Sequence, residues 1–169
     1  RELFRNNVLE VRYVGNKAMY AWAEENWNER VVFENGYMEE WKRAAANLKA
    51  NQAAGRGNTF AYTGVAGTSP LPIYQAYLSG LGGANVTNPA SYTSANYTSS
   101  TFIGDFGDLE PAVLTGAARL DTTAFRANSV LAGFPSNFWQ LNPSTSGVWM
   151  VQDREGSRYN SLQMEIRRR

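Results

Sequence analysis

Neither cysteine nor histidine occurs among the 169 residues of the chain. The lack of cysteine excludes disulfides, thiolate zinc sites, iron–sulfur clusters and a thiol nucleophile. The lack of histidine excludes a Ser/His/Asp triad and imidazole metal ligands. Catalysis would have to depend on carboxylates, Tyr, Ser or the three lysines Lys17, Lys42 and Lys49.

Charge is scarce and balanced. The chain has 16 basic and 15 acidic residues, for a net charge of +1, and only 18% of its residues are charged. Binding to nucleic acid or to an anionic surface generally requires a clustered basic excess. Here the basic residues are interleaved with acidic ones, and residues 57–104 contain no charge at all. The composition therefore predicts no nucleic-acid partner.

Long apolar runs are also missing. No window approaches the roughly 18 to 20 apolar residues that a membrane-spanning helix needs, whereas a barrel strand needs only about 9 to 11 alternating residues. The chain starts at Arg1 without a signal-peptide pattern and ends in three arginines, residues 167–169. We expect it to be a piece of a longer protein.

Two terminal segments alternate between apolar and polar residues, which is typical of β-strands. In the predicted strand 6–18, one face carries Leu9, Val11 and Tyr13, and the other carries Glu10 and Arg12, and the turn residues Gly15-Asn16 are expected to end the alternating run. In the predicted strand 157–169, Leu162, Met164 and Ile166 share one face, and Ser161, Gln163, Glu165 and Arg167 share the other. In a soluble sheet the apolar face would meet a core.

Between these strands the sequence indicates helices. Apolar spacings of three and four, with Gly55 as a stop, predict a helix over 36–53. Pro72 and the Gly82-Gly83 pair bound a second helix over 72–81. A third helical stretch is expected over 111–132, broken near Asp121, which is the expected N-cap of its last turns. Short strands are expected at 137–141 and 147–152.

Residues 85–101 form a neutral segment in which 11 of 17 residues are Ser, Thr or Asn. Such residues favour turns, so we expect a long surface loop that exposes Tyr92 and Tyr97. Aromatic faces beside amides and hydroxyls suit carbohydrate or peptide ligands. The candidate ligand-binding residues are Tyr62, Tyr92, Tyr97 and Trp139. Trp41, Phe125 and Phe138 are expected to serve packing instead.

One carboxylate cluster could carry chemistry. Asp105, Asp108 and Glu110 have the types and spacing to hold a hard cation or to act as an acid/base pair. They lack the acidic density and spacing of an EF-hand loop, and their position before Pro111 favours ordinary acids in a loop or at the N-terminus of a helix.

The terminal strands also resemble a known family. The motifs NNVLEVRYVGNKA and SRYNSLQMEIRRR are similar to barrel strands of TonB-dependent outer-membrane receptors, in particular the Oar-like group with an N-terminal carboxypeptidase-regulatory-like domain. The segments ENGYMEEWKRAAANL, PLPIYQAYL and NFWQLNP resemble parts of the long insertion that follows the first strand in that group. The plug, the TonB-contact segment and the other barrel strands have no counterpart here.

The resemblance implies a β-barrel membrane protein fragment: two antiparallel barrel strands, 6–18 and 157–169, that flank a long mixed α/β extracellular loop over 19–156, α+β in isolation. It implies an active transporter in the outer membrane of a Gram-negative bacterium, with the loop facing the exterior. Its partners would be outer-membrane lipid, TonB through the missing plug, and a small or oligomeric nutrient such as a glycan, peptide or chelate. It also implies no enzyme activity, no metal and no cofactor.

The same resemblance assigns the two faces of the strands. The lipid-facing residues would be Leu9, Val11, Tyr13, Leu162, Met164 and Ile166. The lumen-facing residues would be Glu10, Arg12, Gln163, Glu165 and Arg167, with opposite charges paired between strands. This interpretation requires that 6–13 pairs antiparallel with 159–167. Two alternatives stay open: a self-contained extracellular binding or adhesion module whose terminal strands cover its own core, and a hydrolase built on Asp105, Asp108 and Glu110.

Overall fold

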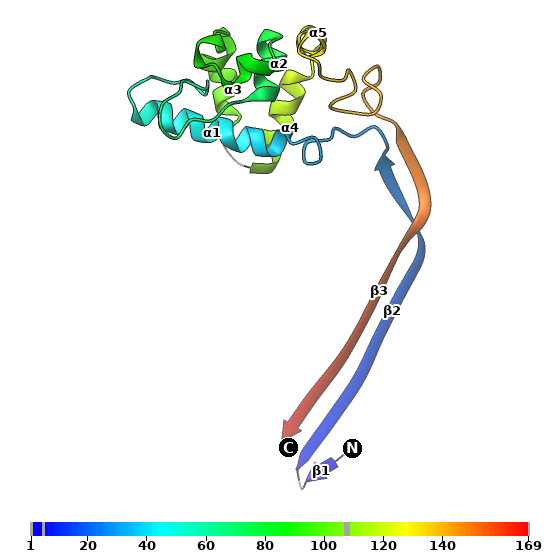
Figure 1. Cartoon of the computed structure of the whole chain (residues 1–169). Coiled ribbons are helices and arrows are strands. Elements are labelled where there is room, and N and C mark those ends of the chain that lie inside the picture. The colour runs from blue at the N-terminus through cyan, green and yellow to red at the C-terminus, as the bar shows by residue number, and fades with distance from the viewer. Residues whose placement is uncertain (1, 5, 107–108, 169) are drawn as a thin grey trace. The chain divides into compact units, whose positions relative to one another are not determined.

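A computed structural model describes residues 2–4, 6–106 and 109–168 (Figure 1). The chain divides into two compact units. The sheet unit comprises Arg1–Trp27 and Gly147–Arg169, and the helical unit comprises Asn28–Ser146. Each unit is described separately below.

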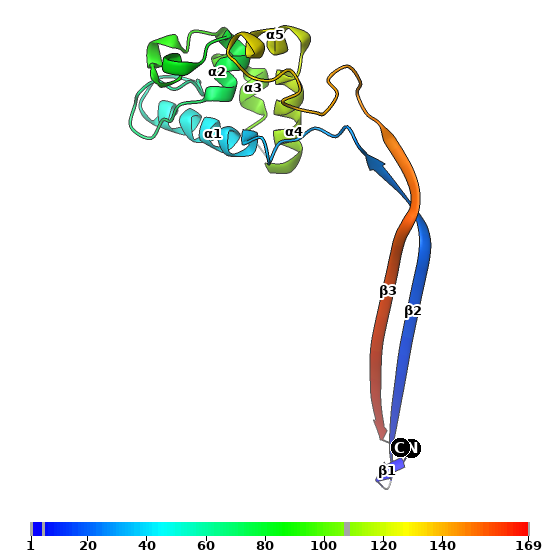
Figure 2. The same cartoon turned by 45° about the vertical axis from the view of Figure 1, so that its right-hand side comes forward.

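The sheet unit is built on two long antiparallel strands, β2 (Asn7–Asn26) and β3 (Trp149–Arg168), of 20 residues each. Their register runs from Asn7 opposite Arg168 to Asn26 opposite Trp149. The predicted antiparallel pairing of 6–13 with 159–167 is therefore confirmed. In Figures 1 and 2 the two strands lie side by side along their length.

Both strands are longer than the sequence pattern predicts. Gly15-Asn16 was expected to end the first strand, yet residues on both sides of it pair without interruption from Asn7 to Ala18. The register shifts only between Ala18 and Ala23, where Tyr20 adopts φ 60. A bulge of this kind absorbs extra residues without ending the strand. The expected boundaries, 6–18 and 157–169, are too short because cross-strand hydrogen bonds continue the strands through residues of weak β-propensity.

A third strand, β1 (Glu2–Phe4), extends the sheet in the order β1-β2-β3. β1 is antiparallel to β2, with Glu2 opposite Val8 and Phe4 opposite Asn7. Residues 5 and 6 alone connect the two strands, and Asn6 adopts φ 70, a left-handed conformation that Asn tolerates. The sequence pattern did not predict this strand, which is only 3 residues long.

Two helices of the helical unit agree with the predicted ones. α1 (Tyr37–Ala53) follows Gly36, and α2 (Pro72–Ser79) begins with Pro72 and ends at Gly80, whose φ is 67. The predicted stretch 111–132 is two helices, α4 (Leu109–Leu120) and α5 (Thr123–Leu131). The N-cap of α5 is Thr122, not Asp121 as expected.

Asp121 is instead held by two arginines. Its carboxylate accepts hydrogen bonds from Arg30 at 3.0 Å and from Arg126 at 2.6 Å, and its side chain is almost fully buried. The hydroxyl of Thr122 is then free to accept from the backbone N–H of Phe125 at 3.3 Å. The N-cap lies one residue later than expected because the buried carboxylate of Asp121 gains more from its two ion pairs than from capping α5. Thr122 provides the cap equally well.

The neutral segment is ordered as a series of short helices. η1 (Gly83–Thr87), η2 (Pro89–Ser91) and η3 (Ala95–Thr98) lead into α3 (Ser100–Gly104). The side chains of Asn88 and Ser94 accept backbone N–H groups at the starts of η2 and η3. The expected strand at 137–141 is wrong, since these residues form turns and bends, whereas most of 147–152 belongs to β3.

The hydrophobic core found in the described residues belongs wholly to the helical unit. Figure 2 shows α1 along one side of this unit, and α2 contacts α1, α4 and α5. Aromatic rings dominate the core and meet edge to face, as they do for Phe60 with Tyr97 and for Tyr37 with Trp139. Such pairs add about 0.5–1.5 kcal/mol each beyond the area they bury. The largest fully buried aromatic side chains are Trp139, Tyr37, Tyr74, Tyr77, Tyr97 and Phe60.

Gly116 of α4 is a point where this core has no spare room. A methyl group at Gly116 would lie 2.6 Å from Tyr37 Oη, which shares a hydrogen bond of 3.0 Å with Tyr74 Oη. We expect Gly116→Ala to lower the free energy of unfolding of residues 28–146 by about 1–3 kcal/mol, as overpacking usually does. Urea denaturation followed by circular dichroism measures the change.

Gly104→Ala is the matched control, because a methyl group there meets no atom within 4 Å. It should stabilise the unit by about 0.5–1 kcal/mol, since alanine has the higher helix propensity. Equal effects of the two substitutions would contradict the packing around Gly116.

Candidate functional site

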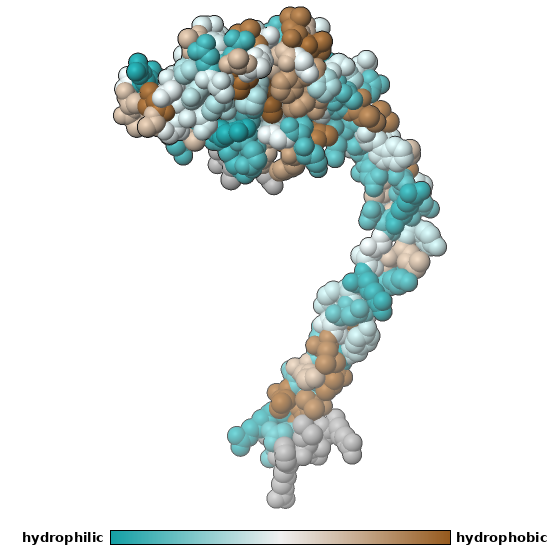
Figure 3. All heavy atoms as spheres, in the orientation of Figure 1, coloured by the Kyte–Doolittle hydropathy of each residue, from teal (hydrophilic) through white to brown (hydrophobic). Residues whose placement is uncertain are grey.

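The residues that the sequence assigned to lipid lie together on one face of the sheet. Over Asn7–Ala18 the register is unbroken, with Leu9 opposite Ile166, Val11 opposite Met164, and Tyr13 opposite Leu162. Five of these six side chains are more than half exposed: Val11, Tyr13, Leu162, Met164 and Ile166. Figure 3 shows hydrophobic side chains gathered over this part of the sheet. We call these six residues the apolar face.

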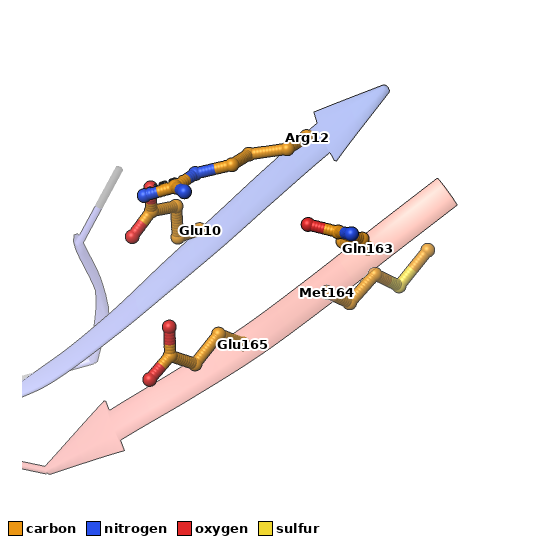
Figure 4. A pocket seen from close by; sticks show the side chains of 5 residues that line it. All are labelled: Glu10, Arg12, Gln163, Met164 and Glu165. Carbon is orange, nitrogen blue, oxygen red and sulfur yellow. Dashed lines mark hydrogen bonds and ion pairs between the residues drawn. The ribbon is translucent and has the colours of Figure 1, made fainter. Parts of the chain in front are cut away.

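The other face carries the residues assigned to the lumen. Glu10 lies opposite Glu165, and Arg12 lies opposite Gln163. Together with Met164 these four residues line a hollow of about 300 Å³ (Figure 4). The expected pairing of opposite charges across the strands is wrong. Instead, Arg12 pairs with Glu10 of the same strand, and Arg167 with Glu165 of the same strand at 2.7 Å.

Register explains this difference. Two carboxylates directly opposite one another repel, so each turns to the arginine two residues away on its own strand. In Figure 4 the dashed line joins Arg12 and Glu10, while the carboxylate of Glu165 lies on the neighbouring strand. The polar face therefore presents two ion pairs side by side rather than a ladder between strands.

Tyr13 closes one end of the apolar face. Its hydroxyl donates to Oδ1 of Asn160 at 2.6 Å, and Asn160 lies on the same face between Leu162 and Arg158. Its ring lies over Gly15, where an added Cβ would come within 3.2 Å of the ring carbon Cε1. Glycine is favoured at position 15 because a larger side chain would contact the ring of Tyr13, and the strand continues past it.

The aromatic residues expected to bind ligand lie in the helical unit, away from solvent. Tyr92, Tyr97 and Trp139 are 9%, 1% and 1% exposed, so the expected exposure of Tyr92 and Tyr97 is wrong. Tyr62 is half-buried and packs against Tyr92 with ring centroids 5.8 Å apart. Packing of Trp41, Phe125 and Phe138, by contrast, is confirmed.

Hydrogen bonds explain why the two tyrosines of the neutral segment turn inward. Tyr97 Oη donates to Oε1 of the buried Gln75 at 2.7 Å. Tyr92 Oη accepts from the N–H of Leu71 at 2.9 Å and donates to the carbonyl of Val86 at 2.8 Å. Burial raises the pKa of Tyr92 to about 12. The Ser, Thr and Asn residues form the turns, so the tyrosine side chains are available to the core.

Glu40 of α1 has a role that sequence analysis missed. The sequence places it beside Glu39 in the first turn of α1, but Glu39 is exposed and pairs with Lys42, whereas Glu40 is 0% exposed. Its carboxylate accepts the N–H groups of Ile73 at 2.9 Å and of Tyr74 at 2.7 Å. These are N-terminal donors of α2, whose N-cap Leu71 has no side-chain acceptor. Glu40 therefore caps a different helix from its own.

Two asparagines continue this polar face of α1. Asn47 bonds the carbonyls of Phe60 and Ser69 and the N–H of Ser69, and Asn51 bonds the carbonyls of Thr59 and Ala61. Both side chains are fully buried. The irregular segment between α1 and α2 thus obtains its backbone partners from α1, as buried backbone groups require.

Of the carboxylate cluster, only the side chain of Asp105 is described. Asp105 is 8% exposed and accepts from Nε of Arg119 at 2.5 Å, an ion pair between α4 and the segment before it. Asp108 and the side chain of Glu110 lie outside the described part of the chain. Among the residues that are described, no group of three or more acidic side chains could hold a metal ion.

One surface feature of the helical unit could contact a ligand. Along the exposed side of α1, Lys42, Lys49 and Gln52 border a groove of about 400 Å³ whose floor includes Trp41 and Phe106. Cations and an amide beside aromatic surface can bind a polar molecule through hydrogen bonds and stacking. The helix pattern offered no signal for this groove, because Phe106 comes from a segment distant in sequence.

Glu40 makes the stability of the helical unit depend on pH. Burial raises the pKa of Glu40 from 4.5 to about 7, although its two backbone hydrogen bonds and Arg43 act in the opposite direction. The folded unit therefore binds more protons than the unfolded chain between these values. The protonated Glu40 side chain stabilises the folded unit, and this contribution to the free energy of unfolding is fully present below about pH 4.5. It is lost as the pH rises through about 7, and the loss is on the order of 3 kcal/mol.

We expect Glu40→Gln to remove this slope, because the amide does not titrate. Urea denaturation of residues 28–146 at pH 5, 6, 7 and 8 measures it. Glu39→Gln is the matched control: it removes an exposed carboxylate one residue away and should keep the slope of the unsubstituted protein. The same slope in Glu40→Gln and the unsubstituted protein would contradict the assignment.

No helix in the described ranges is both long and apolar enough to cross a membrane. Comparisons with protein-family models, curated proteins and solved structures found no match to this chain.

Proposed function

We propose that this chain is part of a TonB-dependent active transporter of the outer membrane, with β2 and β3 as neighbouring barrel strands. The helical unit would be the extracellular loop that captures a nutrient. The observation that carries the proposal is the separation of the two faces of the sheet over unbroken register, with the apolar face exposed. Outside a bilayer, such a face is an aggregation hazard.

The dimensions of the paired strands support this proposal. Residues 7–17 pair with residues 158–168, a length of eleven positions that ends in polar or charged residues on both sides. A barrel strand needs about 9 to 11 residues to cross the hydrocarbon core at a tilt near 45°. The apolar face lies in the middle of this length. The polar face would then border a wet lumen.

The edges of the sheet require further strands. Among the described residues, β3 has β2 as its only neighbour, so its outer edge has unpaired backbone groups. Unpaired backbone groups in hydrocarbon cost several kcal/mol each, and a closed barrel removes them. The proposal therefore needs the remaining strands to come from a longer protein that contains this chain.

The connections support an orientation. Two residues connect β1 to β2, whereas the whole helical unit connects β2 to β3. Barrels of bacterial outer membranes have short turns on the periplasmic side and long loops outside the cell. In the proposed orientation the helical unit faces the exterior, and its groove beside Lys42 and Lys49 can contact a polar nutrient such as a glycan, peptide or chelate.

TonB and the plug enter the proposal through the sequence resemblance alone. The receptor would bind its nutrient outside the cell and import it through the barrel, with energy delivered by TonB to the plug. No catalytic step is proposed for the chain, in keeping with its lack of histidine and cysteine.

A second candidate function is a binding or adhesion module without transport. It is favoured by the core of the helical unit, which lies entirely within residues 28–146 and needs no strand of the sheet. In this alternative, the whole chain would be monomeric in water and would melt cooperatively without detergent. The exposed apolar face of the sheet counts against it.

Two adjacent residues of β3 test the transporter proposal. We expect Met164→Arg to destabilise the receptor in the membrane by about 2–4 kcal/mol, because Met164 would face lipid near the bilayer midplane. Gln163→Arg should have little effect, because Gln163 would face the lumen, where Glu10 and Glu165 beside it offset the charge of Arg12 opposite it. Urea unfolding of the complete receptor from phosphatidylcholine vesicles measures both variants.

In water the two substitutions should change stability by similar small amounts, since Met164 is 66% exposed and Gln163 is also at the surface. Equal, small effects of both substitutions would therefore overturn the transporter proposal and favour the soluble module.

A further inference from the structure

Strand register places two basic residues directly opposite each other at one end of the apolar face. Lys17 of β2 is the Cα partner of Arg158 of β3. Both are exposed, and neither has an ion-pair partner among the described residues. Like charges directly opposite one another in an antiparallel pair are destabilising. A third, anionic group between them would convert this repulsion into binding.

The face that carries this pair has no carboxylate of its own. Side chains alternate between faces, so Lys17 and Arg158 share a face with Leu9, Val11 and Tyr13 and with their partners on β3. Over residues 7–17 and 158–168 this face contains no Asp or Glu, and the acidic residues there, Glu10 and Glu165, are on the opposite face. The net charge of +1 gives no indication of this pair, because Lys17 and Arg158 are far apart in sequence and only the strand register brings them together.

The order of side chains along the face matches a membrane interface. It begins with aliphatic residues, continues with Tyr13, whose ring covers Gly15 and whose hydroxyl bonds Asn160, and ends with Lys17 and Arg158. Tyrosine is enriched where hydrocarbon meets headgroups, because one end is apolar and the other polar. Lys17 lies four residues beyond Tyr13, about 13 Å along the strand and about 10 Å along the normal of a tilted barrel. Its long side chain therefore reaches the headgroup layer.

From this arrangement we infer that Lys17 and Arg158 form a binding site for the phosphate of an anionic lipid in the outer leaflet. This inference rests on the proposed function. A phosphate between the two side chains accepts hydrogen bonds from the guanidinium of Arg158, whose planar fork suits two oxygens, and from the ammonium of Lys17. The acyl chains of the same lipid would lie along the apolar face. That continuity favours a lipid over a soluble phosphate.

The test uses the complete receptor in neutral detergent, with diphosphoryl lipid A as the probe and native mass spectrometry as the measurement of binding. We expect Lys17→Gln/Arg158→Gln to weaken lipid A binding about 30-fold and each single substitution to weaken it about fivefold. Without lipid A the double variant should unfold at the same or a higher urea concentration, because a repulsion has been removed. The single variants keep the test valid if the double variant fails to fold.

Arg43→Gln/Arg56→Gln is the matched control, because it removes two exposed positive charges of the helical unit that lie outside its groove. It should leave lipid A binding unchanged. Unchanged binding in the Lys17/Arg158 variants, or equal losses in the control, would overturn the inference. Competition by inorganic phosphate at the same concentration, or equal binding of dephosphorylated lipid A, would also overturn it.

Failure of the proposed function gives a different result. If the unsubstituted receptor does not insert into vesicles of phosphatidylcholine alone, the transporter proposal fails whatever the lipid A titration shows. If it inserts but binds lipid A no better than the Lys17→Gln/Arg158→Gln variant does, the transporter proposal stands and the lipid site is rejected.

Discussion

The register between β2 and β3 is the constraint on which the sheet unit depends. A slip of one residue would move every side chain of one strand to the opposite face and mix Leu9 and Val11 with Glu165 and Arg167. In the observed register, residues from the two ends of the chain form one apolar face and one polar face. The same register places Glu10 opposite Glu165, and it produces ion pairs along each strand rather than across them.

The helical unit depends on a different kind of interaction, which is the satisfaction of backbone groups by buried side chains of α1. Only 8 residues form α2, too few for stability by propensity alone, and its N-cap Leu71 provides no acceptor. Glu40 supplies that acceptor, while Asn47 and Asn51 bind the irregular segment that precedes α2. Leaving such groups unpaired in an aromatic core would cost about 1–3 kcal/mol for each group. The polar residues of α1 thus allow a core that contains much irregular backbone.

The sequence predicted the periodic elements well. Alternation predicted the two strands and their faces, and apolar spacing with glycine stops predicted α1 and α2. It failed where tertiary contacts outweigh local signals. Gly15 was interpreted as a strand end because its packing partner, the ring of Tyr13, is known only from the structure. Nothing in the sequence indicated that Glu40 caps α2, because its partners, the N–H groups of Ile73 and Tyr74, lie more than thirty residues away.

The candidate ligand residues show the same limit. Composition predicted a long surface loop over residues 85–101, whereas the structure has short helices there, and composition could not indicate the direction of the tyrosine side chains. That direction depends on Gln75 and Leu71, which provide an acceptor for Tyr97 and a donor for Tyr92. The aromatic residues of this segment therefore stabilise the core. The groove that we propose as a ligand contact lies instead on the solvent side of α1 and is lined by Lys42, Lys49, Trp41 and Phe106.

The two units place their apolar residues in opposite ways, and this contrast links the structure to the proposed function. The helical unit buries or half-buries its aromatic residues except Phe33, and single apolar side chains at its surface, such as Phe33 and Leu131, are usual for a protein in water. The sheet unit exposes aliphatic residues on one face and has no covering layer among the described residues. A single aqueous solvent accounts for the first arrangement and not for the second. A chain that passes from water into a bilayer and back accounts for both, because the same hydrophobic effect then favours burial in a protein core in one unit and burial in lipid in the other.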